Sequence, residues 1–144
     1  TASARTRAWC PERTAVRRTA RSFKLGAMSA ENPSIFTRII AREIPADIVF
    51  ENERIIAFRD IAPQAPVHLL VVPKTEQYAN VAELAAGDPA LLAEVVATAQ
   101  ELAKEHSDGE YRLVFNTGES AGQTVFHVHA HLLGGALPEG TLAQ

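Results

Sequence analysis

Three histidines separated by single residues, His127, His129 and His131, are the part of this sequence best suited to chemistry. Side chains of a β-strand point alternately to its two faces, so a strand through these positions places all three imidazoles on one face and the intervening apolar residues on the other. Imidazoles grouped in this way repel one another when protonated and need hydrogen-bond partners when buried. Because such a group is costly for a purely structural strand, we expect it to mark a functional site.

Two kinds of chemistry could use this group of imidazoles. Metal binding needs neutral rings that converge on one ion, and two or three of the strand histidines could ligate zinc with His68 as another candidate. Cys10 is the only cysteine, which excludes a thiolate zinc site, and Asp60 alone is a poor second shell for a site built from histidines. Nucleophilic catalysis instead needs one imidazole that its neighbours orient, and a histidine with a pKa of about 6.5 is largely unprotonated at neutral pH.

The residues around the three histidines favour catalysis. Residues 127–133 follow the pattern His-φ-His-φ-His-φ-φ, in which φ is apolar, and in this they closely resemble the histidine triad family. The resemblance covers nearly all of residues 34–135 and includes blocks at 58–66, at 122–124 and at Gly134-Gly135. Several such blocks in the right order are similar to the Hint branch of this family, the nucleoside phosphoramidate hydrolases.

The resemblance implies a role for each histidine. His129 would attack the α-phosphorus of a nucleotide and form a covalent nucleotidyl-histidine that water then cleaves, which divides one hard step into two easier ones. His127 and His131 would orient His129 and bind phosphate oxygens, and His68 would support the three from a neighbouring strand. The resemblance also implies that Thr124 takes part in catalysis.

The resemblance further implies a set of nucleotide-binding residues. Asp60 resembles the carboxylate that accepts both ribose hydroxyls, although an aspartate before Pro63 could equally well form a turn. Further contacts to the phosphate, the ribose or the leaving group are implied for Asn116, Gln123 and Thr124. An apolar clamp around the purine is implied for four residues whose periodicity any core would also show, namely Ile35, Phe36, Ile39 and Phe58.

We therefore expect an enzyme that hydrolyses purine nucleoside phosphoramidates, with no cofactor and no metal. Thr124 stands where Hint members commonly carry Ser, and residues 136–144 lack the Trp found near the C-terminus of many Hint proteins. Two alternatives stay open, a dinucleoside polyphosphate hydrolase and a nucleotide-binding regulator with incidental hydrolysis. The resemblance also implies a homodimer joined through the long helix and the strand after it.

The elements that must position these residues follow from periodicity and end signals. A short helix begins after the N-cap Ser34 and stops at Ile44-Pro45, and Asp88-Pro89 starts a long helix that ends near Asp108-Gly109. Five apolar or alternating segments predict strands, at residues 48–50, 55–58, 67–72, 111–115 and 125–133. The order predicts an α+β domain with a five-stranded, mostly antiparallel sheet, a short N-terminal helix and one long helix.

Length and charge limit what this domain does. The chain has 144 residues, and residues 1–27 form a basic leader that we exclude from the domain at 28–144; an organelle transit peptide is an alternative interpretation of the leader. Residues 28–144 hold seven Lys and Arg against sixteen Asp and Glu, a net charge of −9 that disfavours binding to duplex nucleic acid. No apolar run approaches the roughly 20 residues of a membrane span, so we expect a cytoplasmic protein without membrane contact.

Overall fold

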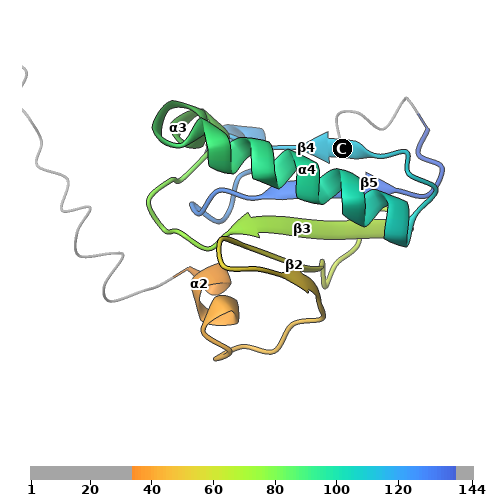
Figure 1. Ribbon diagram of the computed structural model, residues 1–144, viewed down its shortest axis with the longest axis horizontal. Helices are drawn as coiled ribbons and strands as arrows, with labels where there is room; N and C mark the ends of the chain where they lie inside the picture. Colours follow the sequence, from red (N-terminus) through yellow and green to blue (C-terminus); the bar gives the residue numbers. More distant parts are fainter. Residues whose placement is uncertain (1–33, 139–144) are drawn as a thin grey trace, which may run out of the picture.

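The computed structural model describes residues 34–138, and the predicted basic leader therefore lies outside the described residues. Figure 1 shows the helices and strands in chain order. They are α2 (Ile35–Ile40), β1 (Ile48–Glu51), β2 (Ile55–Arg59), β3 (Val67–Pro73), α3 (Val81–Gly87), α4 (Pro89–His106), β4 (Arg112–Val114), the 3₁₀ helix η1 (Glu119–Ala121) and β5 (Ala130–Gly134). None of the described helices is long and apolar enough to cross a bilayer.

The five strands form one sheet in the order β1-β2-β3-β5-β4, and every neighbouring pair is antiparallel. The predicted α+β fold with a five-stranded antiparallel sheet is thus confirmed. β3 lies in the middle and is almost wholly buried, as its continuous apolar sequence requires. β1 and β4 are the two edges of the sheet.

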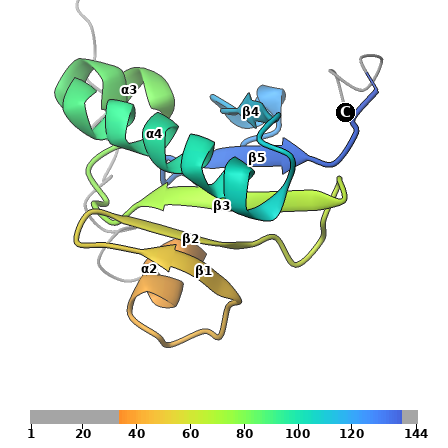
Figure 2. The same ribbon diagram turned by 45° about the vertical axis from the view of Figure 1, so that its right-hand side comes forward.

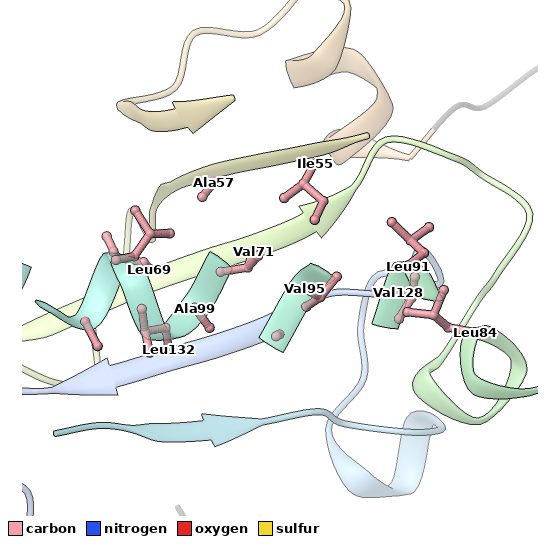
Figure 3. Close-up of a cluster of buried hydrophobic side chains, with 13 residues drawn as sticks. Ile55, Ala57, Leu69, Val71, Leu84, Leu91, Val95, Ala99, Val128 and Leu132 are labelled. Atoms are coloured by element: carbon pink, nitrogen blue, oxygen red, sulfur yellow. The ribbon is translucent and has the colours of Figure 1, made fainter. Parts of the chain in front are cut away.

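The long helix α4 covers one face of the sheet. Asp88 begins the helix, because its carboxylate accepts a hydrogen bond from Leu91 N at 3.0 Å. The apolar stripe of α4 includes Val95 and Ala99, which pack against β2, β3 and β5 (Figure 3). Burial of each large aliphatic side chain in this cluster stabilises the fold by about 1.5–3 kcal/mol.

The short helix α2 packs on the opposite face of the sheet. Figure 2 shows this helix beside β1 and β2. Phe36 and Ile39 contact a second apolar cluster formed by the alternate residues of β2 and β3. The N-cap prediction is confirmed, since Ser34 Oγ accepts a hydrogen bond from Thr37 N at 3.1 Å. The helix ends at Ile40, earlier than predicted, because Arg42 adopts a left-handed conformation with φ of 62°.

The strand predicted at residues 125–133 is shorter than expected. Its hydrogen-bonded part begins only at Ala130, and the last pair of its ladder with β3 joins Ala130 to Val71. Beyond that pair β3 reaches Pro73, which has no N–H to donate, and Val128 N donates instead to Tyr78 O at 3.0 Å. His127 and His129 therefore precede β5 in a segment that lies outside the ladder.

Two helical segments were not predicted, and the bounds of β4 and α4 also differ from the prediction. α3 begins at the N-cap Asn80, and η1 lies in the loop between β4 and β5, where periodicity is too short to detect. β4 is three residues long rather than five, and α4 ends at His106 rather than near residue 108.

Candidate active site

The four histidines gather on the face of the sheet that α2 occupies. His131 in β5 pairs with Leu70 of β3, a member of the α2-side cluster, and His68 lies diagonally across the same ladder. Val128, Ala130 and Leu132 are buried in the α4-side cluster, so side chains alternate through the histidine segment although its first part lies outside the ladder. The prediction that the imidazoles share one face therefore holds.

His127 is locked in place by both of its ring nitrogens. Its Nε2 lies 2.6 Å from Pro73 O, and since a carbonyl can only accept, this nitrogen carries the proton. In the neutral ring Nδ1 must then accept, and its partner is the hydroxyl of Ser34 at 3.3 Å. The residue is only 2% exposed. His127 thus has no ring donor left for a substrate phosphate, although the sequence predicted such a contact.

His129 is held in the opposite tautomer. Its Nδ1 lies 2.8 Å from the backbone oxygen of His127, which assigns the proton to Nδ1 and leaves a lone pair on Nε2. The ring of Phe36 packs edge-on against it at a centroid distance of 4.8 Å. Among the described residues no hydrogen bond uses the Nε2 atom of His129. An imidazole fixed in this way presents its basic nitrogen as a nucleophile.

His68 and His131 form a second pair whose tautomers are also set by the backbone. Gln64 N donates to His68 Nδ1 at 3.0 Å, so His68 Nε2 carries the proton and donates to His131 Nδ1 at 2.9 Å. His131 must then hold its own proton on Nε2. The rings of His129 and His131 are neighbours, with centroids 5.1 Å apart. The site therefore places a nitrogen lone pair on one ring beside an N–H donor on the next.

The four rings are expected to be neutral at physiological pH. Burial lowers the pKa of His68, of His127 and of His129 below the ordinary value, because desolvation disfavours the charged ring. Burial, together with the positive charge that His129 and His68 would carry, lowers the pKa of His131 to about 4. Neutral rings suit both the lone pair of a nucleophile and the hydrogen bonds described above.

The side chains of Asp60, His68 and His131 lie close enough together to be considered as ligands of one metal ion. One ligand atom from each lies within 4.8 Å of the others. A metal on His68 Nε2 would require the proton to move to Nδ1, where it would face the N–H of Gln64. The backbone therefore favours the hydrogen-bonded arrangement of this trio over metal coordination.

Asp60 lies at the end of β2 beside the histidine pair. Its Oδ1 accepts from Ala62 N at 2.8 Å, so it forms the turn that the sequence offered as an alternative role. Its Oδ2 lies 3.4 Å from His68 Nε2. The carboxylate is partly exposed and keeps acceptor capacity on Oδ2, which leaves it able to bind hydroxyl groups of a ligand.

The loop before the histidine segment is organised by Gln123. Its amide oxygen accepts from Gly118 N at 2.9 Å, and its amide nitrogen donates to Ala79 O at 2.6 Å and to Val125 O at 3.1 Å. Both amide protons are therefore used inside the protein, which does not favour the predicted contact to a substrate. Thr124 next to it is exposed.

Of the remaining predicted residues, some lie beside the histidines and others have no recorded hydrogen bond with them. Phe36, Ile39 and Phe58 belong to the apolar cluster beside the histidines, and the rings of Phe36 and Phe58 lie 5.7 Å apart. Ile35 is 44% exposed and free to contact a ligand. Asn116 follows β4 and is partly buried, and within the described part of the chain no recorded hydrogen bond joins it to the histidines.

Three groups outside the four histidines orient their rings, and the sequence analysis did not identify them in this role. They are the backbone oxygen of Pro73, the backbone N–H of Gln64 and the hydroxyl of Ser34. Two are backbone groups that carry no residue-type signal. Ser34 was identified only as a helix cap, because nothing local relates it to His127.

The chain is similar to known proteins of one family. The model of the HIT domain family matches residues 41–136. An uncharacterized HIT-like protein of Synechococcus elongatus is 53% identical over 103 residues, which are 71% of this chain and 90% of that protein. The purine nucleoside phosphoramidase of Escherichia coli is 42% identical over 104 residues, which are 71% of this chain and 87% of that enzyme.

A solved structure gives the same result for the fold. The HIT family hydrolase from Clostridium thermocellum matches with a TM-score of 0.68 and 44% identity, over 73% of this chain and 92% of that chain. The family model covers more than half of the sequence and includes β1 through β5 with all four site histidines. The chain belongs to the HIT domain family.

Proposed function

We propose that the protein is a hydrolase of purine nucleoside phosphoramidates and that His129 is its nucleophile. The observation that carries this proposal is the hydrogen bond from His129 Nδ1 to the backbone oxygen of His127, which leaves the lone pair on Nε2. Two relatives support the class of reaction, because one is named a purine nucleoside phosphoramidase and another a HIT family hydrolase.

In the first step Nε2 of His129 attacks the α-phosphorus, the P–N bond breaks, and the departing amine takes up one proton from solvent, which the second step returns. The nucleotidylated ring becomes cationic and keeps its Nδ1 proton, which the oxygen of His127 accepts at 2.8 Å in the free protein. In the second step water attacks phosphorus, the neutral ring of His129 leaves, and one proton is released. The products are a nucleoside monophosphate and an amine.

His131 serves this reaction by binding rather than by transferring its proton. A ring that titrates at about pH 4 is neutral in the working enzyme, and a neutral imidazole is a very weak acid. Its Nε2 proton, fixed by the bond from His68 to Nδ1, is available to a phosphate oxygen that gains charge.

Nucleotide recognition completes the proposal. Oδ2 of Asp60 accepts the ribose hydroxyls, and the cluster of Phe36, Ile39 and Phe58, with the exposed Ile35, packs against the purine. Thr124 and Asn116 contact the phosphate or the leaving group. Dinucleoside polyphosphates remain a second candidate class of substrate, and the net charge of −9 over residues 28–144 favours small nucleotides over duplexes.

The proposal is tested with His129→Ala, and with His106→Ala as a matched control that removes a histidine at the end of α4. His129→Ala should keep the fold and nucleotide binding and lose turnover by about 10⁴-fold or more, while the control keeps its turnover. Rapid quenching of the unmodified protein with an adenosine phosphoramidate should trap an acid-labile nucleotide on His129. Turnover by His129→Ala, or an adduct on another histidine, would overturn the assignment, and a dinucleoside polyphosphate assayed in parallel identifies the preferred substrate class.

A further inference from the structure

The hydroxyl of Ser34 has a filled set of hydrogen bonds. It accepts from Thr37 N at 3.1 Å, which caps α2, and it lies 3.1 Å from Thr37 Oγ1. Its third partner is Nδ1 of His127 at 3.3 Å. Since a hydroxyl has one proton and His127 Nδ1 can only accept in this tautomer, Ser34 donates to His127 and Thr37 Oγ1 donates to Ser34.

The ring that Ser34 holds is a bridge between distant parts of the fold. His127 joins the N-cap of α2 on one side to the last residue of β3 on the other, through Nδ1 and through Nε2 to Pro73 O. The same residue supplies the backbone oxygen that holds the Nδ1 proton of His129. The hydrogen bonds that fix the ring of His127 therefore also fix its backbone oxygen, and this oxygen orients the ring of His129.

We propose that Ser34 is a positioning residue for the reaction, acting through His127 on the tautomer and orientation of His129. The proposal rests on the nucleophilic role of His129 proposed above. It makes a chemical demand on position 34, which must accept a hydrogen bond from the helix and donate one to the imidazole at the same time. A residue that only caps the helix satisfies the first demand and not the second.

Aspartate separates the two demands. Ser34→Asp keeps a strong N-cap, because a carboxylate accepts from Thr37 N, but it has no proton for His127. The carboxylate would draw a second proton onto the ring of His127 and make it an imidazolium. The titratable groups that face this ring are Glu76, in the loop after β3, and His129, so a charge on His127 would also lower the pKa of His129.

The experiment compares Ser34→Thr, Ser34→Ala and Ser34→Asp with Asp88→Ala, a matched loss of a cap on the opposite face of the sheet. Ser34→Asp should keep the unfolding midpoint of the parent but lower kcat by about 10- to 100-fold with little change in KM. Ser34→Ala should lower both the unfolding midpoint and kcat, and Ser34→Thr should retain the parent values of both. Asp88→Ala should lower the unfolding midpoint alone. The acid limb of the kcat/KM profile should move in Ser34→Asp and stay in place in Asp88→Ala.

Nitrogen-15 NMR of the imidazoles reads the same contact without any turnover. The parent should show a neutral His127 with its proton on Nε2, and Ser34→Asp should show an imidazolium. Unchanged kcat in Ser34→Asp, or the same imidazole spectrum in both proteins, would overturn the positioning role. Turnover in His129→Ala would instead overturn the proposed function, and the spectrum would then still decide whether Ser34 fixes the tautomer of His127.

Discussion

Acidification should destabilise this protein in part through His131, and His131→Asn should remove that part. The ring of His131 is disfavoured as a cation by burial and by the neighbouring His129 and His68, which lowers its pKa to about 4. Asparagine carries no charge at any pH, and its side-chain oxygen can take the place of Nδ1 as the acceptor for His68 Nε2. The substitution therefore removes the titration while it keeps the hydrogen bond.

The magnitude follows from linkage between protonation and folding. The pKa of His131 is lower in the folded state than the 6.5 of an unperturbed histidine, so the unfolded state binds more protons between these two values. Stability from this group is fully present above pH 6.5 and is lost as the pH falls toward 4. For these two pKa values, the loss between about pH 7.5 and about pH 4.5 is about 2.5 kcal/mol.

Urea unfolding of the parent and of His131→Asn at these two pH values measures the loss. The free energy of unfolding of the parent should fall by about 2.5 kcal/mol more than that of the variant. His68, His127 and His129 contribute losses of the same sign in both proteins, as does Glu51, whose pKa is lowered by its hydrogen bonds with Lys74 and Arg42, and these cancel in the comparison. Equal pH dependence in the two proteins would refute the claim that burial keeps His131 neutral.

Four further predictions concern the remaining parts of the site and chain. Asp60→Ala should raise KM more than it lowers kcat, because its proposed contacts are to ribose, and unchanged KM with a collapsed kcat would point to proton transfer instead. Gln123→Ala leaves three backbone groups without their partner and should lower the free energy of unfolding, measured with urea, by about 1–3 kcal/mol. An unchanged unfolding midpoint would show that these hydrogen bonds of Gln123 do not stabilise the loop. A chain that begins at Met28 should fold and hydrolyse like the full sequence, and its aggregation would show that the leader is needed. Light scattering should report a homodimer, since β4 is an open edge of the sheet and Val96 of α4 is 39% exposed, and a monomer at micromolar concentration would contradict this prediction.

Much of the fold follows from local sequence because its signals are local. Asp88-Pro89 marks the start of α4 through one cap and one fixed φ, and the run from Val67 to Val72 reads as a buried strand from composition alone. Local sequence does not predict where a strand or helix ends when a tertiary contact ends it. The strand at residues 125–133 lost its first five residues because Pro73, on another strand, cannot continue the ladder.

The sequence by itself determined which side chains are available for chemistry and, through alternation, that the three imidazoles share a face. Only the tertiary structure decided which nitrogen of each ring carries the proton. The partners that decide it are remote in the chain, since Ser34 lies 93 residues and Pro73 lies 54 residues from His127. Three of the deciding groups are backbone atoms, Pro73 O, Gln64 N and His127 O, and backbone atoms carry no signal of residue type. Residue spacing can thus group the imidazoles on one face, but the tautomer of each ring, on which the proposed role of His129 depends, is set by hydrogen bonds that exist only in the folded chain.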